Sequence, residues 1–264
     1  HLPNDCANHD GLQYGFTRIS FYFAVQISKN CVIIKTKQNT TNNMRGDDMD
    51  TVILQGNSSE DLHKAAALLR AGEAVAFPTD TVYGLGANAK EDVAIQKIYT
   101  AKGRPSDKPL ILLIHDKRQL LQFTENISDT AQKLMDAFWP GSLTLIFPLR
   151  DNTVSAAVTR GKTTVGVRMP NHPIALELLT LADVPIAAPS ANLSGKPSPV
   201  TAEQVAADLD GRIAAIVSGG TCSIGMASTI VDVSSDLPII LRQGAISREQ
   251  LEAVLGIPIK AVND

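Results

Sequence analysis

Two cations lie close together in Lys102-Gly103-Arg104-Pro105, directly after an apolar pattern that has helical spacing. Arginine offers a planar fork for phosphate or carboxylate oxygens, and lysine offers a point charge. Upstream, the hydroxyls of Thr79 and Thr81 follow a short apolar run that Pro78 ends. Hydroxyls at a strand end, followed by a helix that delivers two cations, indicate an anion-binding site. A cation near a helix C-terminus is also stabilising in itself, by a few tenths to about 1 kcal/mol, so the pattern alone leaves both interpretations open.

Three further segments place polar residues at the ends of apolar runs. Arg168 ends the run 163–168, where an arginine must find a counter-ion or reach solvent. Ser190 and Asn192 follow a run of small residues, a position where both are common turn formers. Residues 218–229 are glycine-rich, and successive N–H groups in such a loop can form a nest for an anion.

The elements that would position these residues interleave strands and helices. Several strands follow one another without a helix between them, so the sequence predicts an α/β fold with a sheet of mixed direction and helices packed on it. The apolar patterns predict strands over 51–54, 74–77, 110–114, 143–149, 163–168, 185–188, 214–217, 229–233 and 239–241. They predict helices over 58–71, 91–101, 127–138, 174–181, 201–209 and 247–255, with capping boxes at 201–204 and 247–250.

Residues 1–48 differ in kind from the rest of the chain. They are rich in Asn, Thr and Asp without a sustained period, except for 21–34, which could form one or two strands. We expect a leader that is disordered or outside the fold, with a targeting or interaction arm as the alternative. Residues 49–256 are the expected main domain, and 257–264 are a tail or the start of a linker.

Composition favours a globular α/β protein. Hydrophobic residues make up 44% of the 264, charged residues 19% and aromatic residues 5%, and the net charge is −3. No global positive field would draw the chain to nucleic acid or anionic lipid, so we expect neither strong nucleic-acid binding nor membrane association. Three cysteines without a CxxC pair argue against a zinc cage or disulfide framework, and a cytoplasmic location fits.

Familiar catalytic motifs are absent from the sequence. Residues 84–89, GLGANA, match a dinucleotide-binding pattern only weakly, and loop glycines placed for turning explain them better. There is no Walker-type GxxxxGK[ST], no GxSxG elbow and no HExxH. Zinc or serine-hydrolase chemistry therefore has no support.

Three motifs taken in order are far more specific. PTDTVYGLG (78–86), KGRPSDKPL (102–110) and PSANLSG (189–195) resemble the YrdC/YwlC-type threonylcarbamoyl-AMP synthases, over about residues 50–256. The resemblance implies a YrdC-like twisted mixed sheet in a single main domain. It also implies a nucleotidyltransferase that forms threonylcarbamoyl-AMP and pyrophosphate from L-threonine, bicarbonate or CO2, and ATP, with Mg2+ accompanying ATP. The product would pass to a threonylcarbamoyltransferase that modifies an adenosine of tRNA.

The resemblance also assigns roles to individual residues. Lys102 and Arg104 match the K-x-R pair at the nucleotide phosphates and are the expected catalytic groups. The expected ATP-binding set is Lys102, Arg104, Ser106, Thr164, Ser190, Asn192, Ser198 and Arg242. The expected threonine-binding set is Thr79, Thr81, Arg168, Ala188 and Ser228.

The implied chemistry requires no covalent nucleophile. The threonine amine attacks the carbon, and the resulting carbamate oxygen attacks the α-phosphate of ATP. Such a reaction needs positioning and stabilisation of phosphate charge, which Lys102, Arg104 and Mg2+ would supply. Two alternatives are an RNA-binding module and a carbamoyl-adenylate-handling domain of a maturation enzyme. Scarce aromatics argue against the first, and the lack of acylphosphatase or zinc-finger sequences argues against the second.

One position departs from the family pattern. Many relatives carry His where this chain has Leu113, and His115 follows two residues later. Because side chains alternate along a strand, both would lie on the same face. The sequence leaves open whether His115 takes the place of the family histidine.

Overall fold

The computed structural model describes residues 24–28, 31–35, 50–235 and 237–262. The chain divides into two compact units, His1–Asp47 and Asp48–Asp264. In the first unit, β1 (Ala24–Ser28) pairs antiparallel with β2 (Cys31–Lys35), as expected for strands within 21–34. The remainder of the predicted leader lies outside the described residues.

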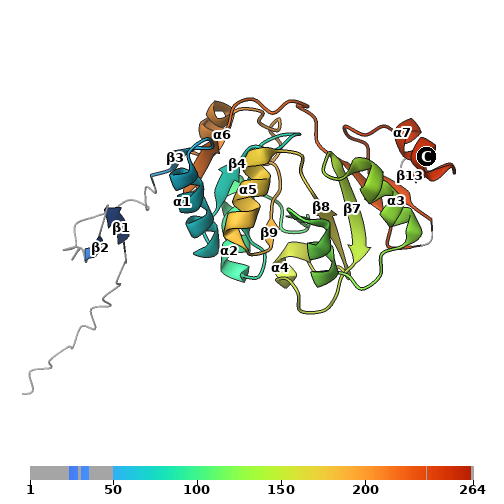
Figure 1. The fold of residues 1–264 in the computed structure, drawn as a ribbon, viewed down its shortest axis with the longest axis horizontal. Helices are drawn as coiled ribbons and strands as arrows, with labels where there is room; N and C mark the ends of the chain where they lie inside the picture. Colours follow the sequence, from blue (N-terminus) through green and yellow to red (C-terminus); the bar gives the residue numbers. More distant parts are fainter. Residues whose placement is uncertain (1–23, 29–30, 36–49, 236, 263–264) are drawn as a thin grey trace, which may run out of the picture. The chain divides into compact units, whose positions relative to one another are not determined.

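The second unit is built on one mixed β-sheet (Figure 1). Its strands are β3 (Val52–Gln55), β4 (Val75–Phe77), β5 (Gly84–Asn88), β6 (Ile111–Leu113), β7 (Leu143–Pro148), β8 (Thr164–Arg168), β9 (Ile186–Ala187), β10 (Ala215–Ser218), β11 (Thr229–Asp232), β12 (Ile239–Arg242) and β13 (Lys260–Ala261). They lie in the order β13-β12-β11-β7-β8-β6-β9-β5-β4-β10-β3. The sheet contains parallel pairs such as β6–β8 and antiparallel pairs such as β7–β8, which confirms the predicted mixed direction.

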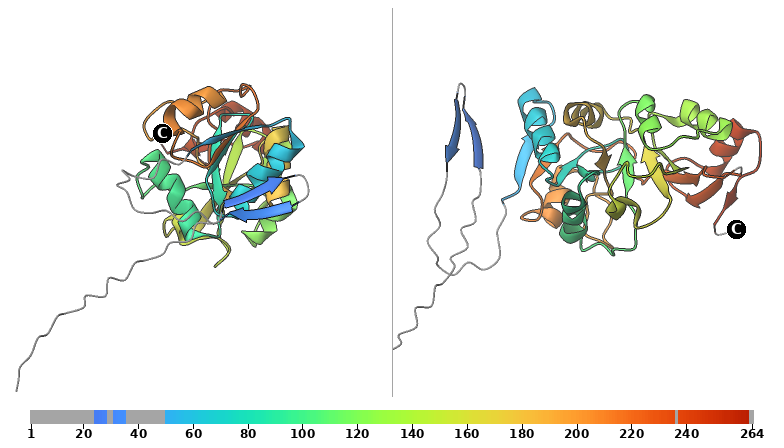
Figure 2. Two further views of the ribbon diagram at one scale, coloured as in Figure 1. Left: turned by 90° about the vertical axis from the view of Figure 1, so that its left-hand side faces the viewer. Right: turned by 90° about the horizontal axis from the view of Figure 1, so that it is seen from below.

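Helices cover both faces of this sheet. They are α1 (Ser59–Arg70), α2 (Asp92–Lys102), α3 (Asp129–Phe138), α4 (Ala156–Thr159), α5 (Pro173–Ala182), α6 (Ala202–Leu209) and α7 (Arg248–Leu255), with a 3₁₀ helix η1 (Lys117–Gln122). α1 and α5 pack together on one face, and α2 and α6 lie on the opposite face (Figure 2). Two buried apolar clusters, one on each side, anchor the sheet. The sequence pattern did not predict α4 or η1, which are too short to show a period.

The glycines of 84–88 form a strand instead of the expected loop. All five residues of β5 are buried, and β5 pairs antiparallel with β4. A Cβ placed on Gly86 would lie 2.6 Å from Cε1 of Phe77 and 2.9 Å from Cγ2 of Ile186. Glycine is therefore required here for close packing within the sheet. A strand made of small residues lacks the β-branched and aromatic signal by which strands are found in a sequence.

The two predicted capping boxes have different outcomes. At α7, the Ser247 hydroxyl accepts from Gln250 N–H and the Gln250 side chain accepts from Ser247 N–H, so the box is confirmed. At α6, Thr201 accepts from Gln204 N–H as predicted, but Oε1 of Gln204 accepts from Val200 N–H at 2.7 Å. The second box is therefore only half formed, because the Gln204 side chain reaches one residue further back.

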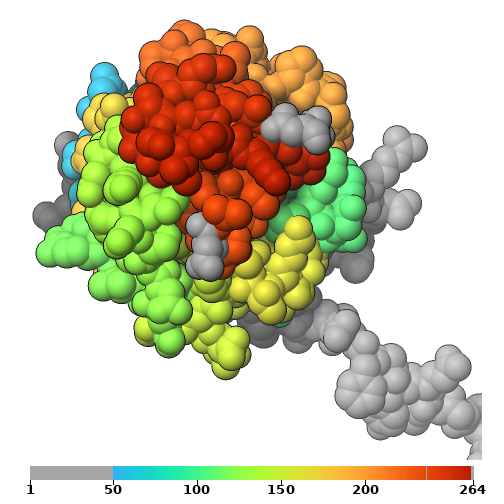
Figure 3. Space-filling view, turned by 90° about the vertical axis from the view of Figure 1, so that its right-hand side faces the viewer, coloured from blue at the N-terminus to red at the C-terminus, as the bar shows by residue number. Residues whose placement is uncertain are grey.

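The segment after Gly256 contributes to the fold, whereas a tail was expected. Ile259 is 3% exposed within the core, and β13 pairs parallel with β12 at the edge of the sheet. α7 also contacts α3, and Figure 3 shows the red C-terminal part of the chain against the green surface. The two-residue strand β13 is too short to give a sequence pattern. Within the described residues, no helix has the length and apolar character needed to cross a membrane.

Candidate functional site

A cavity of about 340 Å³ opens where several strand ends and loops converge. A hollow of this size can hold a small-molecule ligand. Its walls come from the segment after β4, the α2–β6 loop, the ends of β8, β9 and β12, and the start of β11. The lining residues are Thr79, Thr81, Val82, Tyr83, Gly84, Arg104, Lys108, Pro109, Leu110, Ile111, Leu113, Arg168, Ala188, Pro189, Ser190, Ser198, Ala227, Ser228, Ile230 and Arg242.

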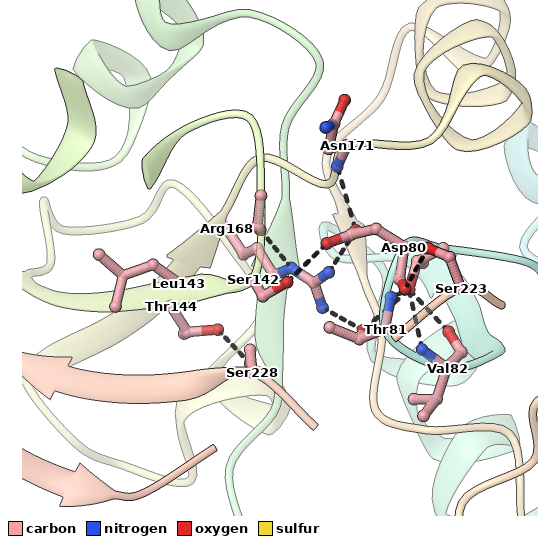
Figure 4. A network of polar contacts seen from close by, with 12 residues as sticks. Asp80, Thr81, Val82, Ser142, Leu143, Thr144, Arg168, Asn171, Ser223 and Ser228 are labelled. Carbon is pink, nitrogen blue, oxygen red and sulfur yellow. Dashed lines mark hydrogen bonds and ion pairs between the residues drawn. The ribbon is translucent and has the colours of Figure 1, made fainter. Parts of the chain in front are cut away.

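Arg168 lies at the centre of a buried polar network (Figure 4). Its Nη2 is 2.5 Å from Oδ1 of Asp80, its Nη1 donates to the Thr81 hydroxyl at 2.7 Å, and its Nε donates to the Gly141 carbonyl at 2.9 Å. The counter-ion that the sequence required is therefore Asp80. Burial lowers the pKa of the Arg168 guanidinium, and the Asp80 charge opposes that effect.

Asp80 joins four separate segments. Its carboxylate also accepts from the Ser142 hydroxyl at 2.9 Å and from Asn171 N–H at 3.0 Å. Its backbone carbonyl accepts from Ile224 N–H at 3.1 Å, which ties the glycine-rich loop to the strand end. The cavity wall around Arg168 is thus held rigidly before any ligand binds.

The hydroxyl of Thr79 closes the turn that follows β4. It donates to the Val82 carbonyl at 2.7 Å, accepts from Val82 N–H at 3.3 Å and lies 3.0 Å from the Thr81 hydroxyl. Thr79 is 3% exposed and Thr81 is 1% exposed. Their oxygens therefore form a fixed, hydrogen-bonded wall of the cavity.

Arg104 and Lys108 line the same cavity from the α2–β6 loop. The Arg104 guanidinium donates to the Pro109 carbonyl at 3.0 Å and, more weakly, to the Lys108 carbonyl at 3.4 Å. Partial burial lowers the pKa of Arg104. Arg104 is half-buried at the cavity wall, whereas a fully exposed basic turn would leave it in solvent.

Lys102 is placed behind the cavity wall. Its ammonium donates to the backbone carbonyls of Ser190 and Asn192, and the residue is 2% exposed. Burial lowers the pKa of Lys102 to about 8, with a further contribution from the Arg104 charge. The side chain joins the end of α2 to the PSAN turn, so it positions Ser190 at the cavity and does not line the cavity itself.

Arg242 and Ser228 form the opposite wall. Nη2 of Arg242 donates to the Ser228 carbonyl at 2.8 Å, and the Ser228 hydroxyl lies 2.8 Å from the Thr144 hydroxyl. Burial and the charges of Arg168 and Arg104 all lower the pKa of Arg242. Three arginines therefore act electrostatically on one another around a single cavity.

The comparisons with known proteins agree with this architecture. The family model Sua5_yciO_yrdC, described as "Telomere recombination", matches residues 67–244. The chain belongs to the Sua5/YciO/YrdC family. It is 58% identical over 193 residues to the threonylcarbamoyl-AMP synthase of Bacillus subtilis (strain 168), an alignment that covers 73% of this chain and 56% of that protein. The chain therefore spans little more than half the length of that relative.

Two other relatives extend the comparison within the family. The crystal structure of P. abyssi Sua5 complexed with L-threonine superposes with a TM-score of 0.76 at 45% identity, covering 80% of this chain and 62% of that one. The threonylcarbamoyl-AMP synthase of Vibrio vulnificus (strain YJ016) is 37% identical over 185 residues, which cover 69% of this chain and 98% of that protein. The fold is thus the predicted YrdC-like α/β fold.

The structure brings most of the family-implied site residues together, but not all of them. Nine of the predicted residues line the cavity: Thr79, Thr81, Arg104, Arg168, Ala188, Ser190, Ser198, Ser228 and Arg242. Lys102 and Asn192 are bonded to the turn behind it, and Nδ2 of Asn192 donates to the Leu193 and Lys196 carbonyls at 2.8 Å.

Two predicted ATP-binding residues, Ser106 and Thr164, are not among the residues that line the cavity. Ser106 lines a separate surface hollow with Arg160. Thr164 begins β8, whereas Arg168 ends it, and four strand steps separate them by about 13 Å. A strand end and a loop tip cannot be assigned to a cavity from sequence, because their distance to it depends on the sheet as a whole.

The open question about Leu113 and His115 has a structural answer. Leu113 lines the cavity, whereas His115 lines a neighbouring hollow of about 100 Å³. β6 ends at Leu113, so the strand alternation that would align the two side chains does not continue. His115 therefore does not occupy the place of the family histidine, and the cavity wall there is apolar.

Sequence reasoning missed Asp80 and Tyr83. Tyr83 lines the cavity, and its hydroxyl donates to the Gly220 carbonyl at 2.9 Å and accepts from Gly219 N–H at 3.2 Å. Both residues lie within the PTDTVYGLG motif, whose density of polar and aromatic groups was the available signal.

The residues present do not fit a resident magnesium ion. Within the described part of the chain, the cavity lining includes no aspartate or glutamate, and no three His, Cys, Asp or Glu side chains cluster as metal ligands. The nearby carboxylate of Asp80 is already bonded to Arg168, Ser142 and Asn171. We therefore derive no step through a protein-bound metal.

Proposed function

We propose that this cavity forms threonylcarbamoyl-AMP and pyrophosphate from L-threonine, bicarbonate or CO2, and ATP. One observation carries the proposal: Arg104, Lys108, Arg168 and Arg242 line a single cavity whose lining, in the described residues, includes no carboxylate. Only the Arg168 charge is compensated by a direct ion pair with Asp80. The remaining positive charge suits a triphosphate, and the names of the relatives favour a synthase over an RNA-binding module or a maturation-enzyme domain.

The two parts of the cavity suit the two larger substrates. The arginine fork of Arg104 and the charges of Lys108 and Arg242 can hold phosphate oxygens. The wall built from Thr79, Thr81, Arg168, Ala188 and Ser228 combines hydroxyls with an apolar surface, which matches a small amino acid that bears a hydroxyl and a methyl group. In P. abyssi Sua5 L-threonine is the bound ligand, and we extend that ligand to this chain.

The reaction balances without a covalent enzyme intermediate. The threonine nitrogen forms a bond to the carbon of CO2 and releases a proton to give a carbamate. With bicarbonate the same bond forms, and a C–O bond breaks so that water leaves and no free proton is released. A carbamate oxygen then bonds to the α-phosphorus of ATP, and the bond to the bridging oxygen breaks so that pyrophosphate leaves. The chain's contribution is to orient both reactants and to stabilise negative charge on the phosphates.

Mg2+ enters this proposal only as part of the ATP substrate, with phosphate oxygens and water as its ligands. The product would pass to a threonylcarbamoyltransferase that acts on tRNA, and we expect both reactions to take place in the cytoplasm. The decisive test incubates the pure chain with ATP, isotopically labelled bicarbonate and each amino acid in turn. We expect a labelled threonine adenylate by mass spectrometry, with an equal amount of pyrophosphate. Unlabelled or absent adenylate in the presence of threonine would reject the proposal.

A further inference from the structure

The exposed loop between α2 and β6 carries two basic residues that line the cavity. Residues 105–109 are all exposed, yet Arg104 and Lys108 line the cavity. Inside the loop, the backbone offers only the weak bond from Lys108 N–H to the Pro105 carbonyl at 3.4 Å. The Arg104 guanidinium adds bonds to the Lys108 and Pro109 carbonyls, but these require that Arg104 is already in place. A contact from outside the loop would fix both cations at the cavity.

Tyr99 holds both ends of this loop. Its backbone carbonyl accepts from Arg104 N–H at 3.0 Å, and its hydroxyl donates to the Lys108 carbonyl at 2.7 Å. The same hydroxyl lies 3.4 Å from the Ala157 carbonyl, and Tyr99 is 3% exposed. The backbone and the side chain of one buried residue thus contact both ends of the loop that begins at Arg104 and ends at Lys108.

Arg160 in turn fixes the Tyr99 ring. The Arg160 guanidinium carbon lies 4.0 Å from the ring centroid, a cation–π arrangement. Arg160 adopts φ 56°, a conformation that costs a non-glycine residue energy, and its Nε is buried without a hydrogen-bond partner in the described residues. The left-handed conformation lets Arg160 N–H donate to the Ala156 carbonyl at 2.9 Å and so caps α4. The buried Nε has no such role, so the contact with Tyr99 is what the side chain itself provides.

We propose that Tyr99, with Arg160 over its ring, is a positioning residue that sets Arg104 and Lys108 for the triphosphate of ATP. The proposal rests on the function proposed above. It predicts that loss of the Tyr99 hydroxyl weakens ATP binding and leaves threonine binding unchanged, because the expected threonine-binding residues lie on other segments.

The main test compares Tyr99→Phe with a matched control. Thr51→Val also removes one hydroxyl, which donates to the Ile213 carbonyl at 2.7 Å and accepts from Gly211 N–H at 2.9 Å, and Thr51 does not line the cavity. Calorimetry should show the ATP dissociation constant raised about 3- to 10-fold in Tyr99→Phe, as expected for one lost hydrogen bond, and unchanged in Thr51→Val. An ATP dissociation constant equal to that of the wild type in Tyr99→Phe overturns the proposal.

A second variant separates positioning from stability. Arg160→Asn removes the guanidinium but keeps a residue that tolerates φ near +56°. We expect its melting temperature to stay within about 3 °C of the wild type, while the ATP dissociation constant rises. A contact that only stabilises the fold would show the opposite: a lower melting temperature with unchanged ATP binding.

Combined variants and hydrogen exchange complete the test. In a background that carries both Arg104→Ala and Lys108→Ala, Tyr99→Phe should change ATP binding by less than about twofold, because both cations through which it acts are then absent. Amide exchange of residues 103–108 should accelerate in Tyr99→Phe and not in Thr51→Val. Calorimetry and exchange need no turnover, so a wild type that makes no adenylate would reject the proposed function while these measurements still decide the role of Tyr99.

Discussion

Nη2 of Arg168 lies 2.5 Å from Oδ1 of Asp80, and the two side chains are only 5% and 7% exposed. The pair joins the end of β8 to the turn after β4, two segments that line the cavity. Removing one member of a buried ion pair leaves the other charge uncompensated. The stability lost in this way is much larger than the net stability that the intact pair contributes.

We therefore expect Asp80→Asn to lower the free energy of unfolding by about 3 kcal/mol or more. The surface pair Lys117–Asp136 provides the control, and Asp136→Asn should cost less than about 1 kcal/mol. Adding Arg168→Gln to Asp80→Asn should recover part of the loss, because no charge then remains buried. Urea unfolding of the four proteins measures each value, and equal losses for Asp80→Asn and Asp136→Asn would contradict the argument.

Arg104 should matter to the reaction much more than to the fold. Its guanidinium contacts two backbone carbonyls at the cavity and no carboxylate. Arg104→Ala should reduce adenylate formation by at least about 10- to 150-fold, the equivalent of one lost charge-assisted hydrogen bond. Arg104→Lys should recover only part, because lysine lacks the planar fork.

The same variants should melt within a few degrees of the wild type. A helix-end role for Arg104 would give the reverse result, with a small stability loss and normal turnover. Melting temperature and adenylate rate measured on both variants distinguish the two outcomes.

We expect the stability of the fold to depend on pH through Lys102. Burial lowers the pKa of Lys102 to about 8 from its ordinary value of 10.5, so the charged form is disfavoured in the folded state. Below pH 8 Lys102 is protonated in both the folded and the unfolded state, and the desolvation of its charge destabilises the folded state. Between about 8 and 10.5 the unfolded state binds the extra proton, so the contribution to stability rises with pH by up to roughly 3 kcal/mol.

Unfolding measured from pH 7 to 10 should show this rise in the wild type and not in Lys102→Met. Over the same range the KM for ATP should increase, because the cavity loses a neighbouring positive charge. If the unfolding free energy of the wild type and of Lys102→Met changed in parallel with pH, Lys102 would be excluded as the source of the pH dependence.

Substrate choice should depend strongly on the hydroxyl of the amino acid. Thr81 and Ser228 present hydrogen-bonded oxygens to the cavity, and a valine side chain would leave such groups without a ligand partner. A site built to bond a hydroxyl rejects analogues that lack it, so threonine should exceed valine by at least about 100-fold in kcat/KM. Similar values for the two amino acids would remove the threonine assignment.

The sequence predicted what depends on local pattern and on motif order. Helix α2 ends at Lys102, one residue beyond the end that its apolar spacing predicts, and Arg168 ends β8 with a counter-ion. The burial of Lys102 could not be predicted from the sequence, because its partners are the carbonyls of Ser190 and Asn192, about 90 positions away in the chain. β5 was missed for a different reason, since small residues that pack closely carry no strand signal.

The position of β10 in the sheet has a consequence for synthesis of the chain. β10 lies between β3 and β4, and Ala215 pairs with both Val52 and Val75. During translation, the strands near the start of the unit remain without their common neighbour until residues 215–218 have left the ribosome. At about 5–20 residues per second this interval is roughly 10 to 30 seconds. An emerging chain thus exposes unpaired strand edges for a period in which a chaperone that covers such edges would protect it from aggregation.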